Sequence, residues 1–449
     1  MSAQKRTCLA IVLAAGEGKR MRSARPKVLH ELAGRSLLAH VLTTVAAAGA
    51  ERVALVVAPG HDSVVKEARS LAPDIEVFVQ SPALGTAHAV LAAKPAIAHG
   101  YDDILVAFAD TPLVQPETFA RLRGALTEEG RAVAVLGFRA SNPRGYGRLI
   151  QDSETLVAIR EDRDLRAEEA EITFCNAGLM AIAGATALSL LESIDCSNAQ
   201  GEYYLTDIVA AARQRGHGAI AVEAPEDEVL GINDRAQLSV AEQVFQNRLK
   251  IRAMQSGVTF IDPSRVTLSY DTQFGQDVLV EPDVFFGREV KVGDGVTIRA
   301  FSHLVGAEIG PNSIIGPFAR LRPGAKLAED VHVGNFVEVK ASTLGAGVKA
   351  NHLAYIGDAT IGAKTNIGAG VITCNYDGFG KFRTEVGAGV FVGVNSALVA
   401  PVKIGDGAYI GTGSVITDDV APDALALARS RQVEKPSWAK DFRTKHRKT

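Results

Sequence analysis

The chain has few cysteines, and their spacing is not that of disulfide pairs or of metal ligands. Its 449 residues include four cysteines, and the spacing of Cys8, Cys175, Cys196 and Cys374 matches neither a disulfide framework nor a zinc site. Scattered thiols of this kind are typical of proteins in a reducing cytosol. We therefore expect a cytoplasmic protein without structural disulfides.

Long hydrophobic runs and a strong charge of one sign are also absent. The first apolar run, Cys8 to Ala15, is too short to span a membrane, and a signal peptide would need a longer apolar core. The 48 Lys and Arg residues against 51 Asp and Glu residues give a formal net charge of -3, which argues against general nucleic-acid binding. We expect neither a membrane nor a nucleic acid among the partners.

A six-residue rhythm fills the second half of the chain. From Leu268 to Val420 nearly every hexad opens with a large apolar residue, often followed by glycine, as in Val292-Gly-Asp-Gly-Val-Thr. The exceptions at the first position are Ala350 and Thr373. Such a short period predicts a parallel β-helix, in which inward residues stack coil upon coil. We expect the glycines to turn the corners, where positive φ is needed.

The first half alternates short apolar runs with helical stretches, and a chain of this length needs more than one hydrophobic core. The first helix is expected from about Leu37 to Ala48, and the expected strands are Leu9–Leu13, Val53–Val57, Ile75–Val79, Ile104–Phe108 and Ala132–Leu136. This alternation predicts an α/β domain with a largely parallel sheet. Ligands of such sheets bind beyond the carboxyl ends of the strands.

A glycine-rich loop follows the first expected strand, in the run Leu13-Ala-Ala-Gly-Glu-Gly-Lys-Arg-Met21. Gly16 and Gly18 would let the backbone approach a phosphate group, and Arg20, Arg25 and Lys27 would supply positive charge. The run is neither a Walker loop nor a dinucleotide motif, because Met21 stands where the third glycine would be. An ordinary strand–helix turn explains the loop by itself equally well.

The continuation Pro26-Lys-Val-Leu-His changes that balance, because the two runs together resemble the signature of sugar-phosphate nucleotidyltransferases. With the hexads behind them, the chain from about Leu9 to Arg429 is similar to a bacterial family of bifunctional enzymes. These enzymes are both N-acetylglucosamine-1-phosphate uridyltransferases and glucosamine-1-phosphate acetyltransferases, and they produce UDP-N-acetylglucosamine. The resemblance implies a Rossmann-like α/β nucleotidyltransferase domain at 1–235, a linker helix at 236–256 and a left-handed parallel β-helix at 257–449. It also implies a homotrimer that shares each acetyl-transfer site between subunits.

For the first half, the resemblance implies attack of N-acetylglucosamine 1-phosphate on the α-phosphorus of UTP with release of pyrophosphate. Arg20 and Lys27 would offset the developing charge, and Asp110 and Asn233 would hold Mg²⁺. Phe108-Ala109 stands where Tyr-Gly is usual, which removes one hydroxyl. The residues that match substrate-binding positions are Leu13, Ala14, Ala15, Gly16, Lys27, Gln80, Gly85, Thr86, Asp110, Gly147, Glu161, Asn176 and Asn233.

For the second half, the exceptions to the hexad rule gather around one histidine. Ala350 and Thr373 open the hexads that contain His352 and Asn375, and an insertion, Phe379 to Glu385, interrupts the rhythm. A lone histidine is more often structural than catalytic, but the resemblance implies that His352 is the general base of acetyl transfer from acetyl-CoA to glucosamine 1-phosphate.

The resemblance also implies binding residues in this half. Asn375 and Tyr376 would hold the substrate and the developing oxyanion. Val394 stands where a serine is expected, which removes a hydroxyl, and Thr412 where an alanine is expected. The matches for the sugar phosphate are Arg322, Lys340, Tyr355 and Asn366, and those for acetyl-CoA are Ala369, Val394, Thr412 and Arg429.

Two other functions are compatible with part of this pattern. One is a sugar-1-phosphate nucleotidyltransferase whose β-helix serves only assembly or regulation; the cluster of His352, Asn375 and Tyr376 argues against it. The other is a scaffold that has lost its nucleotide chemistry; intact Asp110 and Lys27 argue against that.

Overall fold

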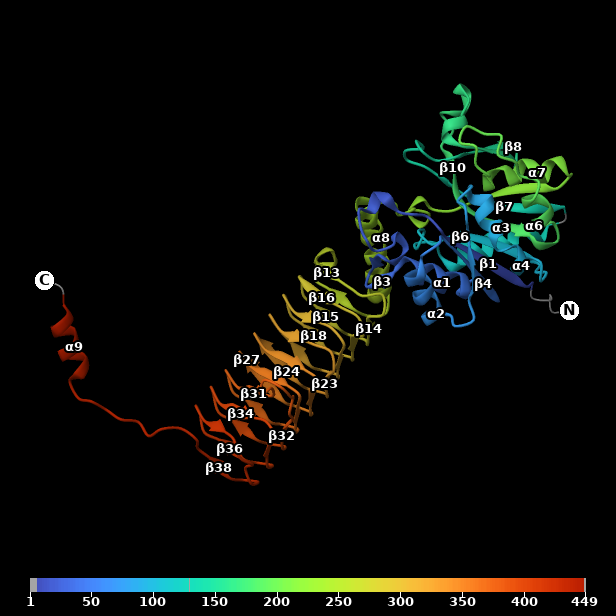
Figure 1. The fold of residues 1–449 in the computed structure, drawn as a ribbon. Helices are drawn as coiled ribbons and strands as arrows, with labels where there is room; N and C mark the ends of the chain where they lie inside the picture. Colours follow the sequence, from blue (N-terminus) through green and yellow to red (C-terminus); the bar gives the residue numbers. More distant parts are fainter. Residues whose placement is uncertain (1–5, 129, 448–449) are drawn as a thin grey trace. The chain divides into compact units, whose positions relative to one another are not determined.

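The computed structural model describes residues 6–128 and 130–447, and the chain divides into two compact units between Asn247 and Arg248. This division falls within α8 (Arg235–Gln255), so the domain limits at 235 and 257 stay a prediction. Figure 1 shows the mixed sheet of the first unit and the stacked coils of the second.

The first unit is a twisted sheet with helices on its faces. The sheet order is β11-β7-β10-β6-β1-β4-β5. These strands are β1 (Cys8–Ala14), β4 (Arg52–Val57), β5 (Glu76–Val79), β6 (Asp103–Phe108), β7 (Arg131–Arg139), β10 (Phe174–Ala183) and β11 (Gly218–Glu223), with the hairpin β8 (Arg148–Asp152) and β9 (Thr155–Arg160) attached to β10 and the small pair β2 (Glu31–Leu32) and β3 (Arg35–Ser36) apart. The helices are α1 (Leu37–Ala47), α2 (Asp62–Leu71), α3 (Thr86–Ala92), α4 (Lys94–Ile97), α5 (Pro116–Gly124), α6 (Gly184–Leu191) and α7 (Ile208–Gln214).

The expected strands and the first helix are all present, and their ends lie at most three residues from the predicted ones. The sheet is less uniform than expected, because β10 runs antiparallel to both β6 and β7. Since β1, β4, β5, β6, β7 and β11 are mutually parallel, their carboxyl ends share one edge with the amino end of β10. That edge collects side chains from distant parts of the sequence.

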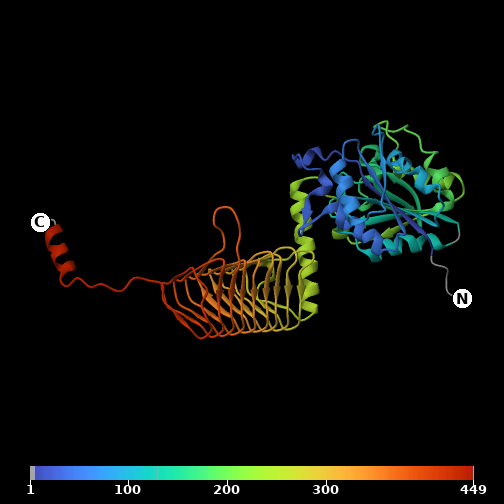
Figure 2. The same ribbon diagram turned by 60° about the horizontal axis from the view of Figure 1, so that its bottom comes forward.

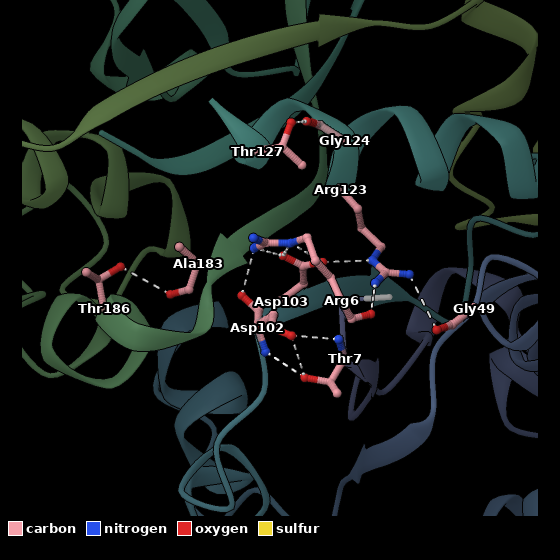
Figure 3. Close-up of polar contacts among 10 residues, drawn as sticks. All are labelled: Arg6, Thr7, Gly49, Asp102, Asp103, Arg123, Gly124, Thr127, Ala183 and Thr186. Carbon is pink, nitrogen blue, oxygen red and sulfur yellow. Dashed lines mark hydrogen bonds and ion pairs between the residues drawn. The ribbon is translucent and has the colours of Figure 1, made fainter. Parts of the chain in front are cut away.

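A buried carboxylate secures the opposite edge of this sheet (Figure 3). Asp103, at the start of β6, is fully buried and accepts hydrogen bonds from Arg6 Nη2 at 2.5 Å and from Arg123 Nε at 3.1 Å. Arg123 Nη2 also donates to the Arg6 carbonyl at 2.9 Å. A buried charge is stable only when it is paired and hydrogen-bonded, and these contacts fix the amino ends of β1 and β6.

The second unit begins with the last two turns of α8, which cover the open end of the β-helix. Ala253 and Leu249 pack into its apolar core. Lys250 is 6% exposed, and its ammonium donates to the carbonyls of Pro263 at 2.8 Å and Val266 at 3.0 Å. A solenoid needs such a cap because its first coil has no preceding neighbour.

Three parallel sheets form the faces of the β-helix (Figure 2). The first, which we call sheet C, contains β12 (Thr259–Phe260), β15 (Leu279–Val280), β18 (Thr297–Ile298), β21 (Ile314–Ile315), β24 (His332–Asn335), β27 (Lys349–His352), β30 (Asn366–Ile367), β33 (Phe391–Val392), β36 (Tyr409–Ile410) and β38 (Leu425–Ala426). Sheet D contains β13 (Val266–Thr267), β16 (Val284–Phe286), β19 (His303–Leu304), β22 (Arg320–Leu321), β25 (Glu338–Lys340), β28 (Tyr355–Gly357), β31 (Ile372–Cys374), β34 (Ala397–Val399) and β37 (Val415–Ile416). Sheet E contains β14 (Gln273–Phe274), β17 (Lys291–Val292), β20 (Ala307–Ile309), β23 (Ala325–Leu327), β26 (Thr343–Leu344), β29 (Ala359–Ile361), β32 (Thr384–Val386) and β35 (Val402–Ile404). Beyond them lies the exposed helix α9 (Trp438–His446).

The first residue of each hexad faces the core, as predicted: all but the half-buried Phe274 are buried, including the exceptions Ala350 and Thr373. The prediction for the glycines is right mainly at the fourth position, where Gly295 and Gly347 have positive φ, and at Gly316 in the second position. It is wrong at the other second positions, such as Gly334 and Gly362, which do not have positive φ. A Cβ on Gly334 would lie 2.0 Å from the Asn351 carbonyl oxygen, and one on Gly362 would lie 2.3 Å from the Gly387 carbonyl carbon. Glycine is needed there because successive coils approach closely, not because φ is positive.

Candidate active sites

A cavity of about 400 Å³ opens at the carboxyl edge of the sheet, beside the ends of β1, β5 and β6. Most of the residues expected to bind UTP line it: Leu13, Ala14, Ala15, Gly16, Lys27, Gln80, Gly85, Thr86 and Asp110. They come from loops that leave parallel strands, so the topology of the sheet explains why they meet.

The glycine-rich loop turns bare backbone toward this cavity. A Cβ on Gly16 would meet no protein atom within 4 Å, so the space beside Gly16 is open to a ligand. Gly18 has a φ of +63°, and a Cβ there would lie 2.6 Å from the Cβ of Lys27. Glycine at 18 therefore lets the loop lie directly against the Lys27 segment.

The Lys27 ammonium lies between two oxygen atoms at the floor of the cavity. It pairs with Asp110 Oδ2 and donates to Asn233 Oδ1 at 3.2 Å. The Ile232 N–H donates to the Asp110 carbonyl at 2.9 Å, which holds the Asn233 segment beside the end of β6. A carboxylate and an amide oxygen that already share one cation are the hard ligands that Mg²⁺ and Ca²⁺ prefer, so the pair fits a divalent metal.

The other wall of the cavity is fixed by close backbone contacts. Gln80 is 6% exposed, and its Nε2 donates to the Gly85 carbonyl at 2.9 Å. Gly85 has a φ of +114°, and a Cβ there would lie 2.6 Å from the Tyr203 carbonyl oxygen. Only glycine tolerates both the angle and the approach. The result is an amide side chain held rigidly at the cavity wall.

The three residues expected to contact the sugar lie together beyond this cavity lining. The Asn176 N–H donates to the Gly147 carbonyl at 2.8 Å, and a Cβ on Gly147 would lie 3.5 Å from Glu161 Oε2. Glu161 Oε1 accepts a hydrogen bond from Thr206 Oγ1 at 3.1 Å. Burial raises the pKa of the Glu161 carboxyl, and the nearby Asp207 adds to this. Arg20, in contrast, is exposed and outside the cavity lining.

On the β-helix, His352 belongs to a column of equivalent positions, one in each coil. A backbone hydrogen bond links each of these positions to the next coil. The residue that directly follows the position in one coil donates its N–H to the carbonyl of the equivalent position in the preceding coil, at 2.8 to 3.4 Å. We name this the His352 column, and its members in order are Asn335, His352, Ala369, Val394 and Thr412. The column therefore contains the expected base and three of the four residues expected to bind acetyl-CoA. The fourth, Arg429, donates from Nη1 to the Thr412 carbonyl at 2.7 Å.

Three cationic side chains, those of Arg322, Lys340 and the loop residue Lys381, lie close enough for their charges to interact. Arg322 and Lys340 occupy equivalent positions in consecutive coils, and the neighbouring Lys381 ammonium lowers the pKa of Lys340. Glu338 offsets part of the charge, since its Oε1 accepts from Arg322 Nη1 at 2.8 Å. Such a cluster suits a phosphate group, which has the charge and acceptors to bind it.

The interruption of the hexads forms a loop that stands out from the coils (Figure 2). Asn375, at its base, is 8% exposed and donates from Nδ2 to Asp358 Oδ2 at 2.5 Å and to Tyr355 Oη at 3.4 Å. Tyr376 is 61% exposed, and its hydroxyl donates to the Gly378 carbonyl at 2.6 Å. Asn375 thus contacts Tyr355 of sheet D, whereas Asn366 lies on sheet C.

Comparison with known proteins agrees with both halves. The MobA-like NTP transferase domain matches residues 10–187, and the bacterial transferase hexapeptide (six repeats) matches residues 306–341 and 383–418. "Bifunctional protein GlmU" of Xanthobacter autotrophicus is 58% identical over 438 residues, 98% of each chain. The proteins of that name from Azorhizobium caulinodans and Bartonella quintana are 56% and 49% identical, again over 98% of each chain. The chain belongs to the GlmU family.

Membership in the GlmU family confirms the fold class and the function expected from the sequence. The chain combines a nucleotidyltransferase domain with a left-handed β-helix of hexapeptide repeats, and it is a bifunctional enzyme of UDP-N-acetylglucosamine synthesis. Its substrates are small molecules, and its nucleotidyltransferase half requires a divalent metal ion. The single-activity and scaffold alternatives do not fit full-length identity to bifunctional GlmU relatives.

Sequence reasoning missed several residues near these GlmU sites. Glu202 lines the nucleotide cavity, and Asp358 and Asn335 contact residues at the second site. Asn335 offered no signal, because an asparagine inside a regular hexad resembles any solvated position. Among the described residues no cluster of three His, Cys, Asp or Glu side chains could hold a metal. In the same part of the chain no helix combines the length and apolar character needed to cross a membrane.

Proposed function

We propose that the cavity beside β1 and β6 binds UTP and N-acetylglucosamine 1-phosphate, and that the cation is Mg²⁺. Gly16 and its neighbours would cradle the triphosphate through backbone N–H groups. Gln80 and the Gly85-Thr86 step would recognise the uracil through a fixed amide and backbone edges. Gly147, Glu161 and Asn176 would hold the N-acetylglucosamine.

The uridylyl step needs no covalent nucleophile from the protein. A phosphate oxygen of the sugar phosphate attacks the α-phosphorus of UTP, a P–O bond forms, and pyrophosphate leaves with the electron pair of the broken bond. Lys27 would place positive charge on the phosphoryl oxygens. Arg20 would add further positive charge from outside the cavity lining.

Asp110 and Asn233 would hold the Mg²⁺ through one carboxylate and one amide oxygen. When bound, the ion would neutralise charge on the phosphate oxygens of the substrates. The support for this assignment is the contact that both side chains make with one ammonium group in the cavity.

We propose that the His352 column is the acetyl-transfer site. His352 would take the proton of the glucosamine 1-phosphate amine as its nitrogen attacks the thioester carbonyl of acetyl-CoA. Asn375 and Tyr376 would stabilise the oxyanion, and collapse of the tetrahedral intermediate expels the CoA thiolate, which takes the proton back from His352. Arg322, Lys340, Tyr355 and Asn366 would bind the sugar phosphate.

The observation that carries the acetyl-transfer assignment is the His352 column itself. One line of coils contains His352 and then, in order, Ala369, Val394 and Thr412, with Arg429 bonded to the last. An extended pantetheine arm along this line would reach the imidazole with its thioester.

Two substitutions test both assignments in the same protein. With acetyl-CoA and glucosamine 1-phosphate, thiol release should fall at least about 100-fold in His352→Ala, because a positioned base contributes about that much or more. With UTP, Mg²⁺ and N-acetylglucosamine 1-phosphate, pyrophosphate release should collapse in Asp110→Ala. Each variant should keep the other activity. If the wild type releases no thiol, the acetyl-transfer proposal is wrong; if Asp110→Ala retains full turnover, the metal site is wrong.

We also propose a homotrimer that shares its acetyl-transfer sites. The support is that the residues expected for one sugar phosphate lie on two sheets of a single chain, with Asn366 on sheet C and Lys340 on sheet D. Light scattering should give three chains per particle. Mixed trimers of Asn366→Ala and Arg322→Ala chains should recover part of the activity that each variant lacks by itself, and no recovery would contradict sharing.

A further inference from the structure

Asn335 contacts the histidine at the centre of the acetyl-transfer site. It ends β24, and His352 ends β27, where the two residues are paired in register in consecutive coils. The distance between Asn335 Oδ1 and His352 Nδ1 is 2.8 Å, within hydrogen-bond range. The Leu353 N–H donates to the Asn335 carbonyl at 3.0 Å, so both backbones are fixed.

This contact determines which ring nitrogen is free. The amide oxygen of asparagine has lone pairs and no hydrogen, so it can only accept. His352 must then carry its proton on Nδ1, and in the neutral ring the lone pair is on Nε2. A base needs its lone pair on the nitrogen that faces the amine.

The position of Asn335 in the His352 column separates it from the acetyl donor. Ala369, Val394 and Thr412 follow His352 in the coils on one side, and Asn335 precedes it on the other. Asn335 therefore contacts the base without standing on the path that we assign to acetyl-CoA. Being uncharged, it orients the ring without adding a counter-charge to an imidazolium.

We propose that Asn335 is a positioning residue that holds His352 in the Nδ1–H tautomer and presents Nε2 to the substrate amine. This inference rests on the proposed role of His352 as the base. Asn335 itself makes no contact with reacting atoms.

Three substitutions separate the hydrogen bond from the shape of the side chain. Asn335→Leu keeps the approximate volume and removes the acceptor, so thiol release should fall about 10- to 100-fold in kcat, a part of what a positioned base contributes. The KM for acetyl-CoA should change little. Asn335→Asp keeps an acceptor and should retain kcat within about threefold, with the acid limb of its pH profile moved upward because a carboxylate favours the imidazolium. Asn335→Ala should resemble Asn335→Leu.

Nitrogen-15 NMR of the imidazole provides a readout that a purely structural role would not change. In the wild type and Asn335→Asp, the His352 signals should have the Nδ1–H pattern, and in Asn335→Leu the two tautomers should mix. Resonances are assigned by their loss in His352→Ala. Uridylyl transfer by the same chains is the control for folding, and it should not change.

The acetyl-transfer activities of these variants distinguish the role of His352 from the role of Asn335. If His352→Ala keeps acetyl transfer, the base assignment fails and this inference fails with it. If His352→Ala is inactive but Asn335→Leu has the kcat of the wild type, the base stands and Asn335 has no positioning role. A wild-type Nε2–H pattern would also overturn the proposal, because Asn335 would then donate rather than accept.

Discussion

Gly16 offers a sharp test of the nucleotide cavity, because its substitution separates ligand binding from stability. A Cβ at 16 would meet no protein atom within 4 Å, and its φ lies outside the left-handed region. Gly16→Ala should therefore leave the free energy of unfolding within about 0.5 kcal/mol of the wild type. The added methyl group would occupy cavity space, where we place the triphosphate.

The magnitude follows from the hydrogen bond that the methyl group disturbs. A bond between a backbone N–H and a phosphate oxygen contributes about 1.5–3 kcal/mol, as bonds to charged groups do. Since about 1.4 kcal/mol corresponds to a factor of ten, the KM for UTP should rise about 10- to 100-fold. The KM for acetyl-CoA should be unaffected, because that site lies on the β-helix.

Two matched variants complete the experiment. A Cβ on Gly124, on α5, also meets nothing within 4 Å, so Gly124→Ala should leave the KM for UTP unchanged and raise stability by up to about 1 kcal/mol, because alanine favours a helix over glycine. Gly85→Ala should destabilise the unit by several kcal/mol, because its Cβ would lie 2.6 Å from the Tyr203 carbonyl oxygen at a φ of +114°. Urea unfolding and pyrophosphate release measure the two effects. A Gly16→Ala enzyme with unchanged KM for UTP would refute the place we give to the triphosphate.

Other predictions concern stability and pH. Lys250→Met should lower the free energy of unfolding of the β-helix by about 2–3 kcal/mol, because two buried carbonyls lose a charged donor; the exposed Arg252→Met is its control, and equal urea midpoints would contradict the capping role. Thr373→Val should cost about 1–3 kcal/mol, because the Gly357 N–H loses its acceptor at 2.8 Å, and an unchanged midpoint would show that this bond contributes nothing. Burial raises the pKa of Glu161, so its carboxylate destabilises the fold as pH rises from the usual glutamate range to the raised value. Glu161→Gln should therefore be more stable than the wild type at pH 7 and equal to it below about pH 4, while its KM for N-acetylglucosamine 1-phosphate rises; an unfolding difference that persists in acid would refute the burial argument.

The β-helix could be predicted well from the sequence because the burial of each residue depends on its position within its own hexad. Inward and outward positions repeat with the hexad, so the burial of Val292 or Ile404 can be read without knowing which coil lies beside it. The antiparallel placement of β10 was beyond such reasoning, because it depends on pairing with β6 and β7 from distant parts of the chain.

The exceptions to the hexad rule were only partly informative. Ala350 and Thr373 drew attention to the right coils, yet both are buried core residues, and the Thr373 hydroxyl bonds the Gly357 backbone of the neighbouring coil. Asp377 caps the loop, since its Oδ1 accepts from the N–H groups of Phe379 and Gly380 at 2.8 and 2.7 Å. Asn335 obeys the rule and contacts His352. The hexad pattern predicts which residues are buried, but it does not predict which side chains of neighbouring coils contact each other.

The regular spacing of the coils fixes the distances between the residues of the His352 column. Neighbouring strands of a sheet are about 4.8 Å apart, so the three steps from His352 to Thr412 span about 14 Å. In the proposed site, a donor held at Thr412 and Arg429 brings its acyl group to the amine beside His352 only if its arm matches that span. Inserting or deleting one whole coil between them would change the length of donor that the enzyme accepts while leaving every side chain of both ends intact.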